Sequence, residues 1–234
     1  MKLVGEFFKA RLTERANKYL AYIKLDDTHE EFKAHVPDPG RLKELLYPDA
    51  EVVVRKEEKA GRKTPYTIVG VKTGKIWVNI QSILTNKLFE EEYKKIPFFK
   101  DYEILRREYT YGNSRFDFLL ENQITKEQAF LEVKSSTLVK EGRALFPDAP
   151  TTRGAKHVKE LTKALEEGYG SIIVFVIKRE DASSLSPHVT IDPVFAEHLR
   201  NAIEKGVKAL AVKCSYDPIE KYELEIEKEV PVLL

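Results

Sequence analysis

Cysteine is almost absent from this sequence, since Cys214 is the only one among 234 residues. A single cysteine excludes an internal disulfide framework and fits a reducing compartment. It lies in the apolar run 209–214, which predicts a strand with a buried thiol. The sequence also lacks the long apolar stretch of a signal peptide and any run of about 18 apolar residues that would span a membrane. These absences predict a soluble, cytoplasmic protein with no membrane partner.

Net charge is nearly absent as well, because the formal net charge is +1. This value excludes a surface that is basic throughout. The charges are unevenly distributed, since residues 1–84 carry 16 Lys and Arg but only 12 Asp and Glu. The first part is therefore suited to a polyanion and the more acidic remainder to a cation, although a surplus of this size is also ordinary surface variation. Methionine is scarce and one-third of the residues are charged, a composition that resembles that of thermophile proteins.

Short strand-like runs fill the first part of the chain. Five short strands in a small module predict a compact β-barrel. An OB-like barrel accommodates the turn and the helical turns of 37–46 between the second and third strands, and an SH3-like barrel is the alternative. The five predicted strands are 18–25, 30–34, 51–55, 66–71 and 75–79.

The pattern becomes helical from Ile83 to about Phe99. We place the domain boundary here, so that residues 1–84 form the first domain and residues 85–234 the second. Beyond the helix, strands and helices alternate, which predicts a mixed α/β sheet with right-handed crossovers. The chain is thus expected to be a two-domain protein of the α+β or α/β class. The predicted strands are 104–111, 115–120, 129–133, 171–177 and 207–213, and the predicted helices are 153–167 and 193–205.

A hairpin within this second domain carries the residues best suited to chemistry. Residues 114–120 and 130–136 each alternate apolar and polar side chains with period two, as strands do, and the spacer 121–128 is polar enough to turn. Alternation places Glu132 and Lys134 on one face of their strand, while Asp117 projects from the neighbouring strand. Two carboxylates and a lysine suit a Mg or Mn ion beside a water that attacks a phosphodiester. The alternative is an ion pair of Lys134 with Glu132 or Asp117 at a sheet edge.

Further polar side chains are placed to approach this hairpin. In the helix 153–167, Arg153, Lys156, His157 and Glu160 have the spacing of one helix face, which is suited to contact with a phosphate. His157 is expected to contact phosphate or to act as an acid, and pairing with Glu160 is the alternative. Glu108 is a candidate third carboxylate, with an ion pair to Arg107 or Arg115 as the alternative.

Basic residues of the first domain are candidates for nucleic-acid contact. Aromatic side chains such as Tyr19 and Trp77 lie between them in the sequence, and OB barrels bind single strands by combining a basic groove with aromatic stacking. The alternative is that the aromatics fill the barrel core while the cations are solvated. The candidates are Arg11, Arg15, Lys18, Arg41, Lys43, Arg62 and Lys63, together with Arg153 and Lys156 of the second domain.

Two resemblances extend these expectations. Three consecutive strands followed by a helix and a parallel strand, with Asp117 and then Glu132-Val133-Lys134, resemble the core of the PD-(D/E)xK nuclease superfamily. This resemblance implies metal ligation by Asp117, Glu132 and the backbone carbonyl of Val133, with Lys134 orienting or deprotonating a water.

The segment 146–161, Phe-Pro-Asp-Ala-Pro-Thr-Thr-Arg-Gly-Ala-Lys-His-Val-Lys-Glu-Leu, resembles the signature of the sugar fermentation stimulation protein family. Residues 35–42 and 132–135 match two other stretches of that family. The chain departs from it at Asp38-Pro39, where Asn-Thr is common, and at Thr152, where Glu is common. The resemblance implies a DNA-binding protein with an N-terminal OB-like domain and a nuclease-like C-terminal domain.

The sequence therefore predicts a DNA-binding protein with a Mg- or Mn-dependent phosphodiesterase site. A non-catalytic DNA-binding regulator on a nuclease-like scaffold and a protein-interaction module are the competing hypotheses. Single- and double-stranded DNA are both candidate partners, and RNA binding and a homodimer are left open.

Overall fold

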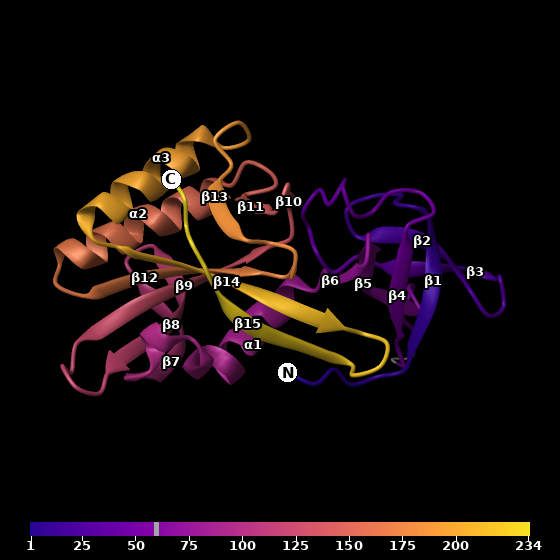
Figure 1. The fold of residues 1–234 in the computed structure, drawn as a ribbon, viewed down its shortest axis with the longest axis horizontal. Coiled ribbons are helices and arrows are strands. Elements are labelled where there is room, and N and C mark those ends of the chain that lie inside the picture. The colour runs from indigo at the N-terminus through magenta and orange to yellow at the C-terminus, as the bar shows by residue number, and fades with distance from the viewer. Residues whose placement is uncertain (59–60) are drawn as a thin grey trace.

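Two six-stranded sheets lie side by side in the computed structural model, which describes residues 1–58 and 61–234 (Figure 1). The first sheet is built from the N-terminal residues, and the second is covered by helices. Among the described residues, no helix combines the length and the apolar character that crossing a bilayer requires.

The first sheet closes into a barrel. Its strand order is β3-β2-β1-β4-β5-β6, and β3 also pairs in parallel with β5, through Ala34 opposite Tyr66. This return pairing joins the two ends of a five-strand array, so the OB-type barrel is confirmed and the SH3-like alternative is not adopted. The strands are β1 (Phe7–Glu14), β2 (Leu20–Leu25), β3 (Glu31–His35), β4 (Glu51–Lys56), β5 (Tyr66–Thr73) and β6 (Ile76–Asn79).

The central strand β1 is one that the sequence analysis missed. Only Ala10 and Leu12 of this strand are fully buried, while Lys9 and Arg11 alternate with them, so the apolar signal is weak. The first strand predicted from the sequence is 18–25, which would leave Arg11 ahead of the sheet, and this expectation is wrong. Arg11 lies within β1, and Arg15 follows directly after it.

The second sheet is mixed, as expected. Its order is β15-β14-β12-β9-β8-β7, with β12 parallel to both of its neighbours and the remaining pairs antiparallel. The C-terminal strand β15 and the small sheet β10-β11-β13 were not predicted. The strands are β7 (Tyr102–Tyr111), β8 (Ser114–Asn122), β9 (Gln128–Ser136), β10 (Val139–Lys140), β11 (Arg143–Phe146), β12 (Gly170–Ile177), β13 (Ser184–Pro187), β14 (Lys208–Asp217) and β15 (Glu223–Val230).

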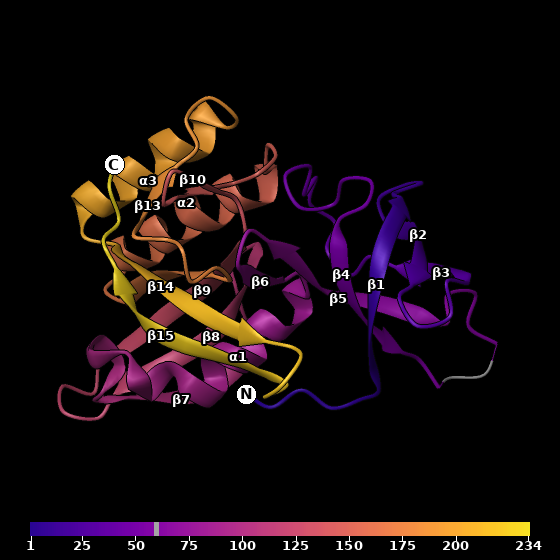
Figure 2. The ribbon, with the colours of Figure 1, turned by 45° about the vertical axis from the view of Figure 1, so that its right-hand side comes forward.

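Helices cover both faces of the second sheet (Figure 2). On one face lie α2 (Thr152–Glu166) and α3 (Pro193–Lys205), whose apolar residues share a core with Ile173 and Phe175 of β12. The other face is covered by α1 (Thr85–Glu92) and the short 3-10 turns η1 (Ser82–Leu84), η2 (Tyr93–Lys95) and η3 (Pro97–Phe99).

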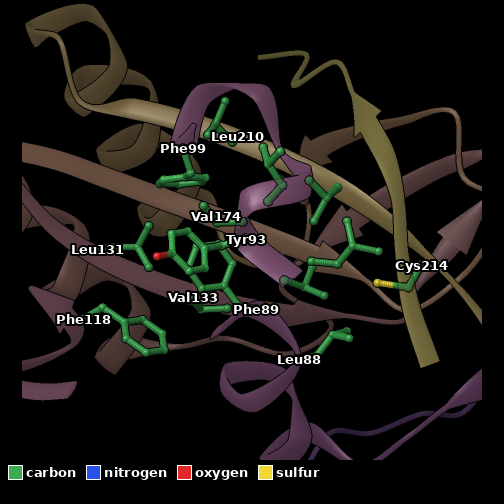
Figure 3. Packing of buried hydrophobic residues seen from close by; sticks show 14 of the residues in the cluster. Leu88, Phe89, Tyr93, Phe99, Phe118, Leu131, Val133, Val174, Leu210 and Cys214 are labelled. Carbon is green, nitrogen blue, oxygen red and sulfur yellow. The ribbon is translucent and has the colours of Figure 1, made fainter. Parts of the chain in front are cut away.

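The core beneath α1 combines aliphatic side chains from the sheet with a group of aromatic rings (Figure 3). Phe89 lies at its centre, with its ring centroid 5.3 Å from that of Phe99 and 5.6 Å from that of Phe118. Cys214 is 1% exposed within the same cluster, which confirms the prediction of a buried thiol. Because aromatic side chains bury large apolar areas, this cluster fixes α1 firmly against β8 and β9.

The barrel is joined to the second domain at both of its ends. After β6 the chain passes through η1 directly into α1. Before β1, the N–H of Leu3 donates to the carbonyl of Tyr222 over 2.7 Å, and Lys2 pairs with Glu223 of β15. The residues preceding the barrel therefore lie along the second sheet.

Buried Lys178 links the same two domains. It follows β12, is fully buried, and donates from Nζ to the carbonyl of Gln81 over 2.5 Å and to Asn79 Oδ1 over 3.3 Å. Burial lowers the pKa of Lys178 to about 8, although Asp38 acts in the opposite direction.

Candidate functional site

The second sheet splits open at Asp117. The pairing of β8 with β9 ends at Phe118 opposite Leu131, and the pairing of β8 with β7 skips Asp117 and Glu108. Glu108 has a φ of 51°, a left-handed conformation that non-glycine residues rarely adopt. Phe116 joins the core beneath α2 and Phe118 the core beneath α1, although strict alternation predicts one face for both. The strand therefore twists at Asp117 and opens a gap beside it.

The carboxylate of Asp117 fills part of this gap. It accepts a hydrogen bond from the N–H of Val133 over 2.7 Å, which takes the place of a ladder bond between the strands. Its other oxygen accepts from Asn86 Nδ2 of α1, also over 2.7 Å. Asp117 is therefore held between β9 and the first turn of α1.

Glu132 lies on the opposite side of the gap and faces α2. Its residue surface is 3% exposed, and its Oε1 accepts from Lys134 Nζ and from His157 Nδ1, each over 2.5 Å. Its Oε2 is buried and has no hydrogen-bond partner. A buried carboxylate oxygen without a partner is costly unless a ligand satisfies it.

Burial and nearby charges shift the pKa values of these two carboxyl groups in opposite directions. Burial raises the pKa of Asp117, and the nearby charge of Glu132 raises it further. Burial would also raise the pKa of Glu132, but the charge of Lys134 and the contact with His157 outweigh it and lower that pKa. Glu132 is therefore the carboxylate that stays ionised more readily.

Both carboxylates line a cavity of about 270 Å³. Lys134, Arg153 and the hydroxyl groups of Thr85 and Ser135 line it as well, and both hydroxyl oxygens are buried without a partner. Three polar atoms without partners around one cavity indicate that a polar ligand completes it. Thr85, Asn86 and Ser135 were missed in the sequence analysis, because short polar residues at a helix start or strand end give no distinctive pattern.

The cavity suits a hard cation. Within residues 1–58 and 61–234, no group of three or more His, Cys, Asp or Glu side chains is arranged to hold a metal ion. Two carboxylates with a free Glu132 oxygen nevertheless offer the oxygen ligands that Mg²⁺, Mn²⁺ and Ca²⁺ prefer, with backbone carbonyls and water completing such shells. The residues present therefore fit a hard divalent cation, which prefers oxygen ligands, better than a softer metal, which prefers nitrogen or sulfur ligands.

His157 is held in one tautomer by its neighbours. Its Nδ1 lies against Glu132 Oε1, and its Nε2 lies 3.4 Å from Arg153 Nε, which can only donate. The histidine therefore donates to Glu132 rather than pairing with Glu160. Arg153 and Lys156 are exposed on the same helix, and Lys156 Nζ donates to the carbonyl of Asn113 over 2.5 Å.

Glu108 lies apart from these groups. Its carboxylate is 3.5 Å from Arg115 in an exposed ion pair, the alternative considered from the sequence. It does not line the cavity that holds Asp117 and Glu132. The structure therefore brings together Asp117, Glu132, Val133, Lys134 and His157, but not Glu108.

The basic residues of the barrel fall into two sets. Arg15 and Arg62 are engaged: Arg15 donates to the carbonyls of Gly40 and Arg41, and Arg62 pairs with Glu57 over 2.8 Å. Burial also lowers the pKa of Arg15. Arg62 is nevertheless exposed, and so are Arg11, Lys18, Arg41, Lys43 and Lys63. Of these, Arg11 lies 3.8 Å from both Asp49 and Glu51, and Lys18 lies over the exposed ring of Tyr19 at 5.3 Å.

An OB barrel followed by a mixed sheet that splits at a pair of carboxylates defines a two-domain protein with an N-terminal OB domain and a C-terminal α/β domain. Family models agree with this description. Residues 13–80 match the SfsA N-terminal OB domain, and residues 83–220 match the sugar fermentation stimulation protein RE domain. The chain belongs to the sugar fermentation stimulation protein family.

Individual relatives match over the full length. The sugar fermentation stimulation protein homologs of Clostridium acetobutylicum and Acetivibrio thermocellus are 43% and 40% identical, and each alignment covers 100% of both chains. Among solved structures, Pyrococcus furiosus SfsA in complex with Ca²⁺ superposes with a TM-score of 0.87 at 30% identity, again with 100% of both chains covered.

Proposed function

We propose that this protein is a divalent-metal-dependent nuclease that acts on DNA. The observation that carries the proposal is the partnerless, buried Oε2 of Glu132, which shares a cavity with Asp117 and Lys134. The Ca²⁺ complex of the Pyrococcus furiosus relative supports a hard-cation site in this family.

In this proposal, Asp117, Glu132 and the backbone carbonyl of Val133 hold Mg²⁺ or Mn²⁺. A divalent cation bound there supplies positive charge to a phosphoryl oxygen and lowers the pKa of a bound water. Carboxylate and carbonyl oxygens are the ligands such cations prefer.

The remaining groups position the ligands and the attacking water. Lys134 lines the cavity and contacts Glu132, so its ammonium is placed to orient a water at the carboxylate. His157 and Asn86 act as positioning residues, because each donates to one carboxylate and fixes its rotamer. Loss of either donor is expected to loosen the cation ligands without removing one.

DNA as the substrate is supported by the basic surface on both domains. Exposed cations occur on the barrel and on the α2 face beside the cavity, and phosphate contacts by Lys and Arg supply most non-specific DNA affinity. Tyr19 is 52% exposed and stacks on His35, with ring centroids 6.4 Å apart, which provides an aromatic surface on which a base can stack.

Cleavage assays with site variants test the proposal. Labelled single- and double-stranded DNA and RNA are incubated with the protein and Mn²⁺ or Mg²⁺, beside Asp117→Asn, Glu132→Gln and Lys134→Ala. Each variant is expected to lose at least about 100-fold in rate, because each removes a group acting on the water or the cation. Glu121→Gln, at the far end of the same strand as Asp117, is the matched control and should retain activity.

Cation binding provides a second measurement that does not depend on turnover. In calorimetric titration with Mn²⁺, the parent should bind at one site, and Asp117→Asn and Glu132→Gln should abolish that heat. DNA binding without cleavage under any cation would favour the non-catalytic regulator, and cleavage that survives all three variants would overturn the assignment of this site.

A further inference from the structure

A second cavity of about 460 Å³ lies beside the carboxylate cavity. Asn113, Ser114 and Arg115 line it from the β7–β8 turn and the start of β8, and Thr152, Arg153, Lys156 and His157 line it from α2. Arg153 lines both cavities, and His157 reaches from the second cavity to Glu132 in the first. A ligand that extends beyond the carboxylate cavity along α2 therefore enters this second one.

The lining of the second cavity is cationic. Arg115, Arg153 and Lys156 are exposed, and no carboxylate is among the lining residues. Two acidic groups lie near its rim. Glu108 forms the exposed ion pair with Arg115, and Glu160 faces the turn at Gly112. An exposed ion pair of this kind contributes little to the stability of the fold, and a phosphate can replace the carboxylate as the partner of Arg115.

Ser114 has a buried hydroxyl group without a hydrogen-bond partner. Its residue surface is 5% exposed, and its Oγ is buried with no hydrogen-bond partner although the residue lines the cavity. A hydroxyl group donates readily to an anionic oxygen. Together with a planar guanidinium and an ammonium, it forms the donor set that phosphate recognition uses.

We propose that this second cavity binds the phosphate next to the scissile one on the same DNA strand, through Arg115, Lys156 and Ser114. This inference rests on the proposed nuclease function and adds that the substrate is a polynucleotide held at consecutive phosphates. A phosphomonoester or a mononucleotide would leave the second cavity without its ligand.

The salt dependence of DNA binding tests the subsite separately from catalysis. Binding of a labelled oligonucleotide is measured by anisotropy in Ca²⁺ at several salt concentrations, for the parent, Arg115→Ala and Lys156→Ala. Each variant is expected to weaken binding about 10-fold and to reduce the slope of log K against log salt by about 0.7 to 0.9. Lys159→Ala removes an exposed cation from the same helix outside both cavities and is the matched control.

Kinetics and a neutral phosphate analogue complete the test. Arg115→Ala and Lys156→Ala should raise KM with kcat nearly unchanged. A methylphosphonate next to the scissile position should weaken binding by the parent but not by a double variant that combines Arg115→Ala and Lys156→Ala. Slopes equal to the parent, or an equal loss in Lys159→Ala, would overturn the subsite. If the parent cleaves nothing, the nuclease proposal fails, whereas the salt slopes still decide whether this cavity binds a backbone phosphate.

Discussion

Lys178 makes the stability of this protein depend on pH in a defined direction. Its ammonium is fully buried between the two domains, and burial lowers its pKa to about 8 from an ordinary value of 10.5. Between these two values the unfolded chain binds a proton that the folded chain does not, so the free energy of unfolding rises with pH. The difference in pKa corresponds to about 3 kcal/mol over the whole interval.

The substitution Lys178→Met removes this contribution while keeping an unbranched side chain of similar length. Between about pH 8 and about pH 9.5, the free energy of unfolding of the parent should gain about 2 kcal/mol relative to the variant. Two neighbouring groups act on the same site: Asp38 opposes the shift of the lysine, and burial raises the pKa of the Cys214 thiol to about 12. Lys178 itself lowers the pKa of both groups, but a carboxyl group titrates below this pH range and a thiol with a pKa of about 12 titrates above it, so within the range the difference between the two proteins reports on the lysine.

Guanidinium chloride unfolding across this pH range measures the effect. Lys63→Met, which removes an exposed lysine of the barrel, controls for the loss of one positive charge. The absolute stability of Lys178→Met is not the criterion, because Gln81 and Asn79 lose a donor in the variant. Parallel pH profiles for the parent and Lys178→Met would refute the reasoning.

Three further outcomes are expected. Thr151→Ala removes the side-chain cap that accepts from the N–H of Gly154 over 2.9 Å, which should cost about 1 kcal/mol and lower Tm by about 2–4 °C in calorimetry, whereas an unchanged Tm would contradict the cap. Lys134→Met should raise the pKa of Glu132, so that Mn²⁺ affinity in calorimetric titration is lost at a higher pH than in the parent. Asn86→Ala takes one of two donors from Asp117 and should weaken Mn²⁺ binding about 10-fold, and equal affinity would exclude a positioning role.

Regular periodicity was sufficient to predict most of the architecture. The strand β12 is apolar from Ile172 to its end and buried on both faces, and α3 begins at the Asp192 cap and ends at Gly206, whose φ is 111°. Such features depend on local sequence. The strand β1 was missed because only two of its residues are buried apolar ones, which is too few for a clear alternation. Its place in the sheet is defined by pairing with β2 and β4.

The candidate site was predicted in its charged members but not in its geometry. Asp117, Glu132 and Lys134 follow from alternation on two adjacent strands. The twist that sends Phe116 and Phe118 to different cores arises where β8 leaves both neighbouring ladders, and no period-two pattern encodes it. Roles that depend on a third element, such as those of Asn86 and Thr85 from α1, likewise require tertiary contacts.

The attachment of the barrel at both of its ends has a mechanical consequence. A domain on one linker swings freely in any direction, whereas a domain held at Leu3 and again at η1 retains at most a rotation about the line joining the two attachments. The hydrogen bonds of Lys178 lie beside the second attachment and oppose even that rotation. The distance between the aromatic surface at Tyr19 and the carboxylate cavity is therefore fixed. A nucleic-acid strand that contacted both would have to span the same length in every complex.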